Sequence, residues 1–483
     1  MKMPAAKPKT SRYTEVERKF DVLETTVSPS FEGLAVVTRV QHSPTQTLEA
    51  VYYDTAGYDL AARKITLRRR TGGSDAGWHI KLPTTGADTR TEVRAALADA
   101  VPEEIRDVVA AIVRDRPLQA VARITTQRSV SLLFGADGTP LAEFCDDNVT
   151  ASALRPDSEP QVWREWELEL VGGGSPEVLE RLGNRLLDAG AVPAGHGSKL
   201  AKVLDVAVPE PAPVSADPVH RAIAENVDAL LVWDRAVRAD AWDAVHQMRV
   251  TTRKIRSLLA EESGPENTWI LDELKQLAAV LGVPRDAEVL ADKYQRALDS
   301  LPADLVRGPV RERLVEGAKQ KYKAGWRRSV AAMRSERYFR LLDALDAVVA
   351  AAPAAAGGAE SQPVTVESAY RKVKKAAKAA EAEGTDEALH RIRKRAKQLR
   401  YTAAAHGDTA VADSAKTIQT LLGDHQDSVV SRTHLLAQAD AAHAAGEDTF
   451  TYGLLYQREA EVALDSENQV GAALKALRKA VGK

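Results

Sequence analysis

The stretch Thr14-Glu15-Val16-Glu17-Arg18-Lys19-Phe20 decides how the N-terminal half of this chain folds. If it is an extended strand, its period of two residues places Glu15, Glu17 and Lys19 on one face and Phe20 on the other. A dry core would not hold two carboxylates and an ammonium, because unpaired buried charge is costly. The face is instead suited to a polar cavity in which a metal ion and an anion are held together.

Composition limits the class of protein. The chain has 483 residues, which is enough for two or more domains, and its hydrophobic content of 44% is ample for packed cores. The single cysteine, Cys145, excludes an internal disulfide and is typical of a reducing compartment. Residues 1–12 lack the apolar core of a signal peptide, and no apolar run reaches the length of a membrane span. We therefore expect a cytoplasmic protein that does not enter a membrane.

Residues 13–206 are predicted to form an α+β domain. Alternating segments separated by turn signals predict strands at Tyr13–Val22, Glu49–Asp54, Lys64–Arg70, Gly77–Leu82, Thr89–Ala95, Val121–Phe134, Pro140–Asp147 and Trp163–Val171. Two further segments, Glu103–Arg114 and Pro176–Ala189, are predicted to be helices.

The C-terminal half differs in kind. Residues 207–217 are rich in proline and predict an extended linker, and residues 1–12 are expected to be disordered. Residues 218–483 are predicted to be entirely helical, and a low-complexity segment at 350–363 divides them into repeats at about 218–349 and 364–483.

Many predicted strands carry one apolar face and one charged face. Arg68 and Arg70 share a face, as do Glu165, Glu167 and Glu169. An open sheet with one solvated side is the commoner cause of such alternation. Both signs of charge nevertheless recur on the same faces, which favours a closed barrel with a charged lumen and an apolar exterior covered by helices. Carboxylates on one wall and Arg or Lys on the others would suit a complex of a hard metal ion with polyphosphate.

Several short motifs follow one another in a characteristic order. They are Glu15-x-Glu17-x-Lys19, Tyr52-Tyr53-Asp54-Thr55, Leu67-Arg68-Arg69-Arg70, Lys81, Arg90-x-Glu92, Arg128, Glu143 with Asp147, Glu165-x-Glu167-x-Glu169 and Ser198-Lys199. This order resembles the CYTH, or triphosphate tunnel metalloenzyme, superfamily. The resemblance implies an antiparallel barrel whose tunnel binds a triphosphate with Mg²⁺ or Mn²⁺.

The resemblance also implies roles for individual residues. Catalytic roles fall to Glu15, Glu17, Lys19, Glu167 and Glu169. Phosphate contacts fall to Lys19, Arg68, Arg70, Lys81, Arg90, Arg123, Arg128 and Lys199. Metal ligation falls to Glu15, Glu17, Glu92, Asp147, Glu165, Glu167 and Glu169.

Two of these positions are ambiguous by parity. Arg123 has the opposite parity to Arg128, so both face one lumen only if a bulge intervenes. Asp146 and Asp147 compete for one inward position, and parity with Glu143 favours Asp147.

The helical half carries two matched basic stripes. His246, Arg249, Arg253 and Arg256 stand at the same offsets as His390, Arg393, Lys397 and Arg400. At about 100° per residue, these offsets fall within an arc of roughly 80°, so each set is one helix face. A solvated face would normally carry acids for i,i+4 pairs, and residues 246–256 and 390–400 contain none. A polyanionic partner therefore explains the stripes better.

The stripes, together with Leu281-Gly282-Val283-Pro284-Arg285-Asp286 and Leu422-Gly423-Asp424-His425-Gln426-Asp427, resemble the CHAD domain. That resemblance implies two pseudo-symmetric helical bundles with a basic groove that binds inorganic polyphosphate. The implied contacts are His246, Arg249, Arg253, Lys254, Arg256, His390, Arg393, Lys394, Lys397, Arg400, Arg371, Lys374, Lys375 and Lys378. Because few aromatic residues interleave the stripes to stack bases, we expect no specific nucleic-acid partner. Because Arg and Lys do not ligate a hard ion, we expect the stripe histidines to serve an anion rather than a metal.

The sequence thus predicts a metal-dependent triphosphatase that hydrolyses inorganic triphosphate or short polyphosphate and is held on polyphosphate granules by its helical half. A polyphosphate-tethering protein with an inactive or slow tunnel is the main alternative. Adenylate cyclase or thiamine triphosphatase activity follows from other members of the CYTH superfamily, but no residue here selects a nucleoside or thiamine. No feature of the sequence selects an oligomeric state.

Overall fold

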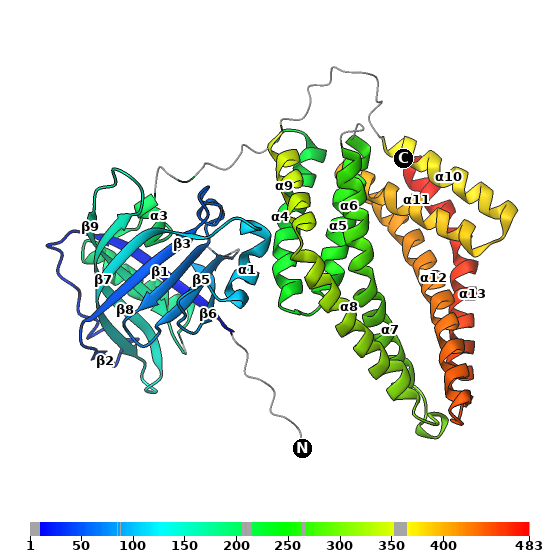
Figure 1. Ribbon diagram of the computed structural model, residues 1–483, viewed down its shortest axis with the longest axis horizontal. Coiled ribbons are helices and arrows are strands. Elements are labelled where there is room, and N and C mark those ends of the chain that lie inside the picture. Colours follow the sequence, from blue (N-terminus) through cyan, green and yellow to red (C-terminus); the bar gives the residue numbers. More distant parts are fainter. Residues whose placement is uncertain are drawn as a thin grey trace. The chain divides into compact units, whose positions relative to one another are not determined.

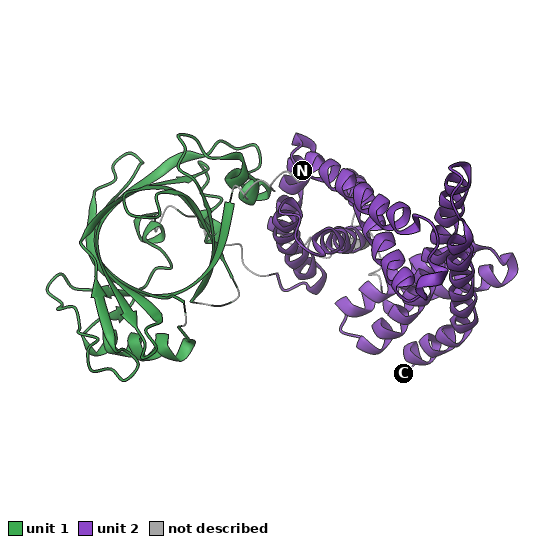
Figure 2. Ribbon diagram, turned by 90° about the horizontal axis from the view of Figure 1, so that it is seen from below, with its two compact units in different colours: residues 1–212 green, residues 213–483 purple. Residues whose placement is uncertain are grey.

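The computed structural model describes residues 10–84, 86, 88–172, 174–204, 208, 215–262, 267–351 and 365–482. The chain divides into two compact units, residues 1–212 and 213–483, which are described separately (Figure 2).

The first unit is a closed antiparallel barrel. Its strands are β1 (Thr10–Val22), β2 (Arg39–His42), β3 (Gln46–Asp54), β4 (Thr66–Thr71), β5 (Gly77–Pro83), β6 (Thr89–Ala95), β7 (Gln119–Phe134), β8 (Pro140–Ala153), β9 (Gln161–Leu170) and β10 (Val192–Pro193). Eight of them follow the order β1-β6-β5-β4-β3-β7-β8-β9, and β9 pairs with β1 to close the ring seen in Figure 2. Strands β2 and β10 extend β7 and β1. The barrel, rather than an open solvated sheet, is the correct interpretation of the alternating charge.

Strand β1 is the seam of the barrel. Its first half pairs with β6 and its second half with β9, and the register sets Glu17 opposite Glu169 and Lys19 opposite Glu167. The opening motif therefore joins the first strand to the last. Residues 10–12, which the prediction placed in a disordered N-terminus, belong to β1, and residues 1–9 lie outside the described ranges.

Helices cover the barrel's outer face. Helix α1 (Glu103–Val113) packs on β5 and β6, and α2 (Pro176–Asp188) packs on β1 and β9. Pro at the first position of α2 fits the expected helix start. The apolar side chains under α2 are those that strand parity turns outward, including Phe20, Trp166 and Leu168. The predicted apolar exterior is present here.

One end of the lumen is apolar, which the alternation did not reveal. The short helix α3 (Lys199–Leu204) packs Leu200 and Val203 against Tyr52 and Ile124 of β3 and β7. A one-turn 3-10 helix, η1 (Ala61–Arg63), connects β3 to β4. The charged lumen is therefore apolar at this end, because a side chain can face inward and still pack against a helix inside the barrel.

The second unit is entirely helical in its described residues, as expected (Figure 1). Its α-helices are α4 (Pro218–Arg238), α5 (Ala244–Glu262), α6 (Thr268–Val280), α7 (Gly282–Asp299), α8 (Gly317–Met333), α9 (Glu336–Ala350), α10 (Val366–Glu383), α11 (Asp386–Ala405), α12 (Thr409–Ala444) and α13 (Phe450–Val481). Short helical turns, η4 (Ala303–Leu305) and the π-helical η5 (Glu312–Glu316), precede α8. The low-complexity segment falls on residues 350–363, most of which lie outside the described ranges, as does most of the predicted linker.

Helices α5 and α11, which carry the two basic stripes, contact one another. Helices α10 to α13 enclose an apolar core that includes Val373, Ile392, Leu399 and Ile418. In the described parts of the chain, no helix is both long enough and apolar enough to cross a bilayer.

Burial under α2 should make the barrel sensitive to truncation there. Replacing the fully buried Leu182 with alanine should lower the free energy of unfolding by about 2–5 kcal/mol, because the change removes apolar contact and leaves a cavity. Leu187→Ala on the exposed side of the same helix is the matched control and should change it little. Differential scanning calorimetry of both variants measures the effect, and equal losses would contradict this packing.

Candidate functional site: a charged tunnel and a basic helical cluster

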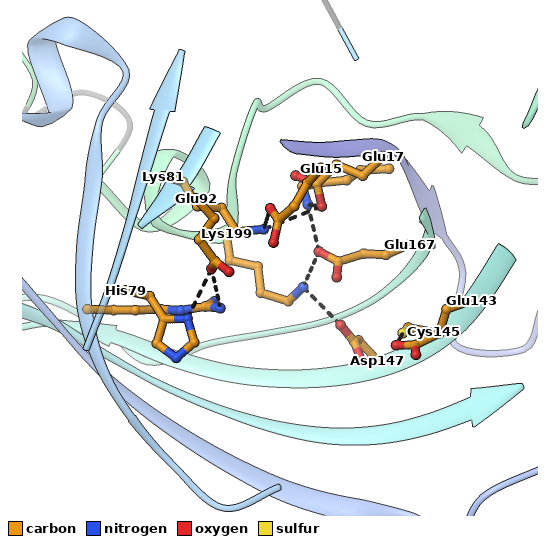
Figure 3. Close-up of polar contacts among 12 residues, drawn as sticks. Glu15, Glu17, His79, Lys81, Glu92, Glu143, Cys145, Asp147, Glu167 and Lys199 are labelled. Carbon is orange, nitrogen blue, oxygen red and sulfur yellow. Dashed lines mark hydrogen bonds and ion pairs between the residues drawn. The ribbon is translucent and has the colours of Figure 1, made fainter. Parts of the chain in front are cut away.

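The barrel encloses a cavity of about 700 Å³. Its lining includes most of the residues predicted from sequence: Glu15, Glu17, Lys19, Arg68, Arg70, Lys81, Arg90, Arg128, Glu167, Glu169 and Lys199. Figure 3 shows carboxylates and ammonium groups from β1, β5, β8, β9 and α3 converging on it. The structure thus brings together in one bore side chains that are far apart in the sequence.

Lys19 lies between two carboxylates. Its Nζ is 2.8 Å from Glu17 Oε2 and 2.8 Å from Glu167 Oε1. Burial alone would raise the pKa of Glu17, but the charges of Lys19 and Lys81 outweigh burial and lower that pKa to about 2. Glu17 is therefore ionised across the physiological range.

Lys199 neutralises a second group of carboxylates. Its Nζ lies 2.9 Å from Asp147 Oδ2 and 2.7 Å from Glu167 Oε1 (Figure 3). The same Nζ lies 2.6 Å from Glu165 Oε1. Arg128 donates from Nε and Nη2 to the two oxygens of Asp147 at 2.8 and 2.6 Å, and also contacts Glu167. Oxygens of these three acids lie within 4.8 Å of one another, which is close enough for a metal site. Lys199 and Arg128 already compensate the charge of these three acids.

Glu169 is the carboxylate without such compensation. It lies beside Glu17 across the β1–β9 pair and beside Glu143 across the β8–β9 pair, and it makes no ion pair with any residue in the described ranges. Burial, followed by the charge of Glu15, raises the pKa of Glu169 to about 7. Burial likewise raises the pKa of Glu15, although Lys81 Nζ lies 2.6 Å from it. Oxygen donors with surplus negative charge are what a hard divalent cation requires, so Mg²⁺ or Mn²⁺ fits this wall.

The guanidinium groups of β4 are only partly paired, and Arg68 Nη2 lies 3.7 Å from Glu92 Oε1. Arg68 Nε and Arg70 Nε are buried, and neither has a hydrogen-bond partner among the described residues. Arg70 Nη2 donates to Asp75 Oδ1 at 2.5 Å, which fixes the side chain and leaves its Nε available. Buried, unpaired donors at a cavity wall are suited to phosphate oxygens.

Two predicted residues, Arg123 and Glu92, lie elsewhere than expected. Arg123 is exposed and does not line the cavity, because the bulge in β7 lies at residue 121 and the register between Arg123 and Arg128 is unbroken. The prediction that Arg123 contacts phosphate in the tunnel is corrected accordingly. Glu92 is fully buried, and its oxygens contact His79 Nδ1 at 3.0 Å and Arg94. That carboxylate orients cations and has no free oxygen facing the cavity, so it does not fit the predicted metal-ligand role.

The remaining predicted acids are placed by strand parity. Asp147 faces inward and is fully buried, whereas Asp146 faces outward and pairs with Arg164 at 2.6 Å. The preference for Asp147 is thus the correct choice. Glu165 is buried beside it and accepts a hydrogen bond from Trp163 Nε1 at 2.6 Å.

Several residues of the site received no role from the sequence, although Glu143 belongs to one of the motifs. Arg94, Thr126, Glu143 and His196 line the cavity, and His79 supports it through Glu92. Strand parity could have identified two of them, because alternate residues of one strand share a face. His79 shares a face with Lys81, and Arg94 shares a face with Arg90. His196 lies on a loop, where no periodic signal exists.

An arginine of each basic stripe packs against a matched glycine in the helical unit. Arg249 lies against Gly282, where a Cβ atom would stand 3.3 Å from its Nη2, and Arg393 lies in the same way against Gly423, at 3.5 Å. Arg249 Nη1 also donates to Asp286 Oδ1 at 2.9 Å. The matched glycines therefore leave room for matched arginines in the two repeats.

Lys397 shows how crowded the positive charge is. Burial, and then the charges of Arg253, Arg393 and Arg249, lower its pKa to about 7. Burial, and then the charges of Arg249 and Arg393, lower the pKa of Arg253 to about 10. Side chains of α5 and α11 thus repel one another across a shared centre, which a bound anion would relieve.

The other predicted members of this site vary in placement. Burial lowers the pKa values of His246 and His390, and His390 Nδ1 has no hydrogen-bond partner among the described residues. Lys254, Arg256 and Arg400 are partly buried on the stripe helices, and Lys394 is exposed. Arg371, Lys374, Lys375 and Lys378 are exposed on α10, so their part in anion binding stays a prediction.

Comparisons with known proteins agree with this architecture. The CYTH domain model matches residues 13–184 and the CHAD domain model matches residues 221–436. The chain belongs to the family of proteins in which a CYTH domain is followed by a CHAD domain.

Full-length relatives share the whole arrangement. The chain is 61% identical over 511 aligned residues to the uncharacterized protein Rv2226 of Mycobacterium tuberculosis H37Rv, with 100% of this chain and 99% of the relative covered. The uncharacterized protein MT2285 of strain CDC 1551 matches equally.

Solved structures resemble the two units separately. The CHAD domain of Ricinus communis is 24% identical over 55% of this chain and 92% of its own, with a TM-score of 0.44. A Hippeastrum protein, HpAC1, described as having a dominant triphosphatase activity, is 16% identical over 41% of this chain and 97% of its own, with a TM-score of 0.24.

The raised pKa of Glu169 predicts how stability depends on pH. The folded pKa of about 7 exceeds the ordinary value of 4.5, so the native state binds more protons than the unfolded state between these limits. The free energy of unfolding of the metal-free protein should therefore fall as pH rises through this window. Glu169→Gln should remove this loss, stabilising the protein at pH 8 by roughly 1–3 kcal/mol relative to its effect at pH 5.

Denaturant titrations at both pH values measure this difference. Glu180→Gln, on the exposed face of α2, is the matched control and should follow the wild type. If Glu169→Gln gave the same pH profile as the wild type, Glu169 would not be the uncompensated carboxylate of the cavity.

Proposed function

We propose that the barrel binds a linear triphosphate or short polyphosphate with a divalent cation and hydrolyses its terminal anhydride. The observation that supports this most is the separation of surplus charge in one enclosed cavity. Glu169 makes no ion pair with any described residue, and burial raises the pKa of Glu15 despite its contact with Lys81. The Nε atoms of Arg68 and Arg70 are buried donors without a partner in the described ranges. A metal–triphosphate complex carries both missing partners, and neither an anion alone nor a cation alone does.

The carboxylates of the seam strands are the groups that would hold the cation. Glu15, Glu17 and Glu169 line the cavity on β1 and β9, and Glu143 lies beside Glu169 on β8. When bound, a Mg²⁺ or Mn²⁺ ion would supply Lewis-acid stabilisation to the phosphoryl oxygens.

The chain's own cations would bind and orient the substrate. Arg68 and Arg70 would donate to the non-bridging oxygens, and Lys81 would add charge beside the terminal phosphoryl group. Lys19 and Lys199 hold the acids Glu17 and Glu167 in place. Preorganised donors of this kind stabilise the charge that develops as the terminal group is transferred.

The reaction would be an in-line displacement. A water oxygen bonds to the terminal phosphorus, the anhydride P–O bond breaks, and triphosphate yields orthophosphate and pyrophosphate. A tunnel carboxylate that does not ligate the cation would orient the water and accept its proton.

We further propose that the helical unit binds longer polyphosphate and keeps the protein on polyphosphate granules in the cytoplasm. The support is the shared cationic centre of α5 and α11, where burial and then the charges of the stripe arginines lower the pKa of Lys397 to about 7. A polyanion would relieve this repulsion and release counterions. A tethering protein with an inactive tunnel is the competing function, and the next experiment separates the two.

Phosphate release from inorganic triphosphate with Mg²⁺ or Mn²⁺ tests the catalytic proposal. Glu17→Gln should lower the rate at least about 100-fold, because it removes an ionised carboxylate of the metal-holding wall. Glu159→Gln is the matched control, an exposed residue ahead of β9, and should keep the wild-type rate. A wild-type protein that releases no phosphate, or a Glu17→Gln variant that keeps its rate, would leave tethering as the function.

Polyphosphate binding to the full chain tests the helical site. Arg393→Glu should weaken binding about 10-fold or more and flatten its dependence on salt, because it reverses a charge inside the cationic centre. Arg395→Glu makes the same charge change on the exposed side of α11 and should have a much smaller effect. Equal losses from the two variants, measured by fluorescence anisotropy, would mean that net charge and not the stripe governs binding.

A further inference from the structure

A cluster of ligating side chains lies outside both the tunnel and the basic centre. His425 of α12 is 2% exposed, and its Nε2 lies 2.8 Å from Glu467 Oε1 of α13 and 3.6 Å from Asp386 Oδ1 of α11. One ligating atom from each of the three residues lies within 4.8 Å of the other two. Three helices thus present one imidazole nitrogen and two carboxylate oxygens to a common point.

The fold does not require a polar cluster at this position. In the sequence match between the repeats, His425 corresponds to Pro284, which stands in the same place after the Leu-Gly pair. Pro284 packs directly on Gly325 of α8, where an added Cβ would lie 2.9 Å from the proline ring. The first repeat therefore has an apolar contact at this position, whereas the second has a histidine and two acids.

The three residues of the cluster differ in exposure. The side chain of His425 is 3% exposed, whereas those of Asp386 and Glu467 are 57% and 44% exposed and lie at the surface. Buried His425 could have been satisfied by one acid, so a second acid on a third helix is surplus to a simple ion pair. A ligand that accepts all three groups accounts for the arrangement.

We propose that Asp386, His425 and Glu467 form a binding site for a divalent transition-metal ion, with Zn²⁺ as its best-matched occupant. Zn²⁺ takes imidazole nitrogen at about 2.0–2.1 Å and carboxylate oxygen at about 2.0–2.2 Å, in sets of three protein ligands with water completing the shell. The His425–Asp386 separation of 3.6 Å suits neighbouring ligands of one ion. Glu467 would have to turn from its 2.8 Å contact with His425 to join them. An imidazole favours Zn²⁺ over Mg²⁺, which distinguishes this site from the all-carboxylate wall of the tunnel.

An ion there would act on the polyanion site through α11. Asp386 is the first residue of that helix and lies one turn before His390, the first residue of its basic stripe. Bound metal would clamp the helix start to α12 and α13 and thereby fix the position of Arg393 and Lys397. The role is a positioning one, because no ligand of this cluster belongs to the stripe.

Hydrogen exchange of the full chain with and without ZnCl₂, read by mass spectrometry, tests the proposal. Zn²⁺ at saturating concentration should slow exchange about 10-fold in peptides that contain the first turn of α11 and the segments around His425 and Glu467. Because the readout is local, metal bound in the tunnel changes other peptides and is not confused with this site.

Exposed ligands allow variants that keep the core intact. Glu467→Gln and Asp386→Asn should each abolish the zinc-dependent protection, whereas Asp465→Asn, a nearby exposed position on α13, should retain it. Wild-type protein without zinc-dependent protection at these peptides, or Glu467→Gln protein that is still protected, would overturn the site. Either result is independent of triphosphate hydrolysis and of polyphosphate binding.

Discussion

The compensation of buried carboxylates by lysine and arginine inside a closed bore is the interaction on which the barrel depends. Glu167 illustrates it, since Lys19, Lys199 and Arg128 all contact its two oxygens. Each of these acids would be very costly to bury alone, because removing a charge from water costs several kcal/mol. The cations come from β1, β7 and α3, so the same contacts that satisfy the charge also join the first strand, the middle of the sheet and the helix inside the bore.

The compensation of buried charge is incomplete at one wall of the cavity. Glu169 has no cation partner among the described residues, and the Nε atoms of Arg68 and Arg70 have no acceptor there. An apo protein that keeps such groups apart is less stable than one that pairs them, and perturbed groups of this kind gather at functional sites. The surplus charge therefore indicates what the ligand must carry. In the helical unit the uncompensated charge is positive, because Lys397 is partly buried beside Arg253, Arg393 and Arg249.

Near-symmetry within the helical unit separates structural from functional residues. Glycines 282 and 423 serve both repeats equally, since each leaves room for a stripe arginine. His425 has no such counterpart, because the other repeat has Pro284 in its place. Positions that keep one residue type through both repeats are explained by packing around the shared cationic centre, whereas a position that changes from an apolar contact to a ligating cluster calls for a ligand of its own.

Local patterns in the sequence determined which side chains share a face. Strand parity placed Glu15, Glu17 and Lys19 together and chose Asp147 over Asp146, and helical offsets defined both basic stripes, because these depend only on the repeat of the backbone. The tertiary structure decided everything that requires two distant segments: the β1–β9 closure, the α3 plug, the pairing of Glu92 with His79 and Arg94, the outward position of Arg123 and the meeting of α5 with α11. Whether an inward side chain is paired, unpaired or packed is set by neighbours across the fold, which no periodic pattern along one chain contains.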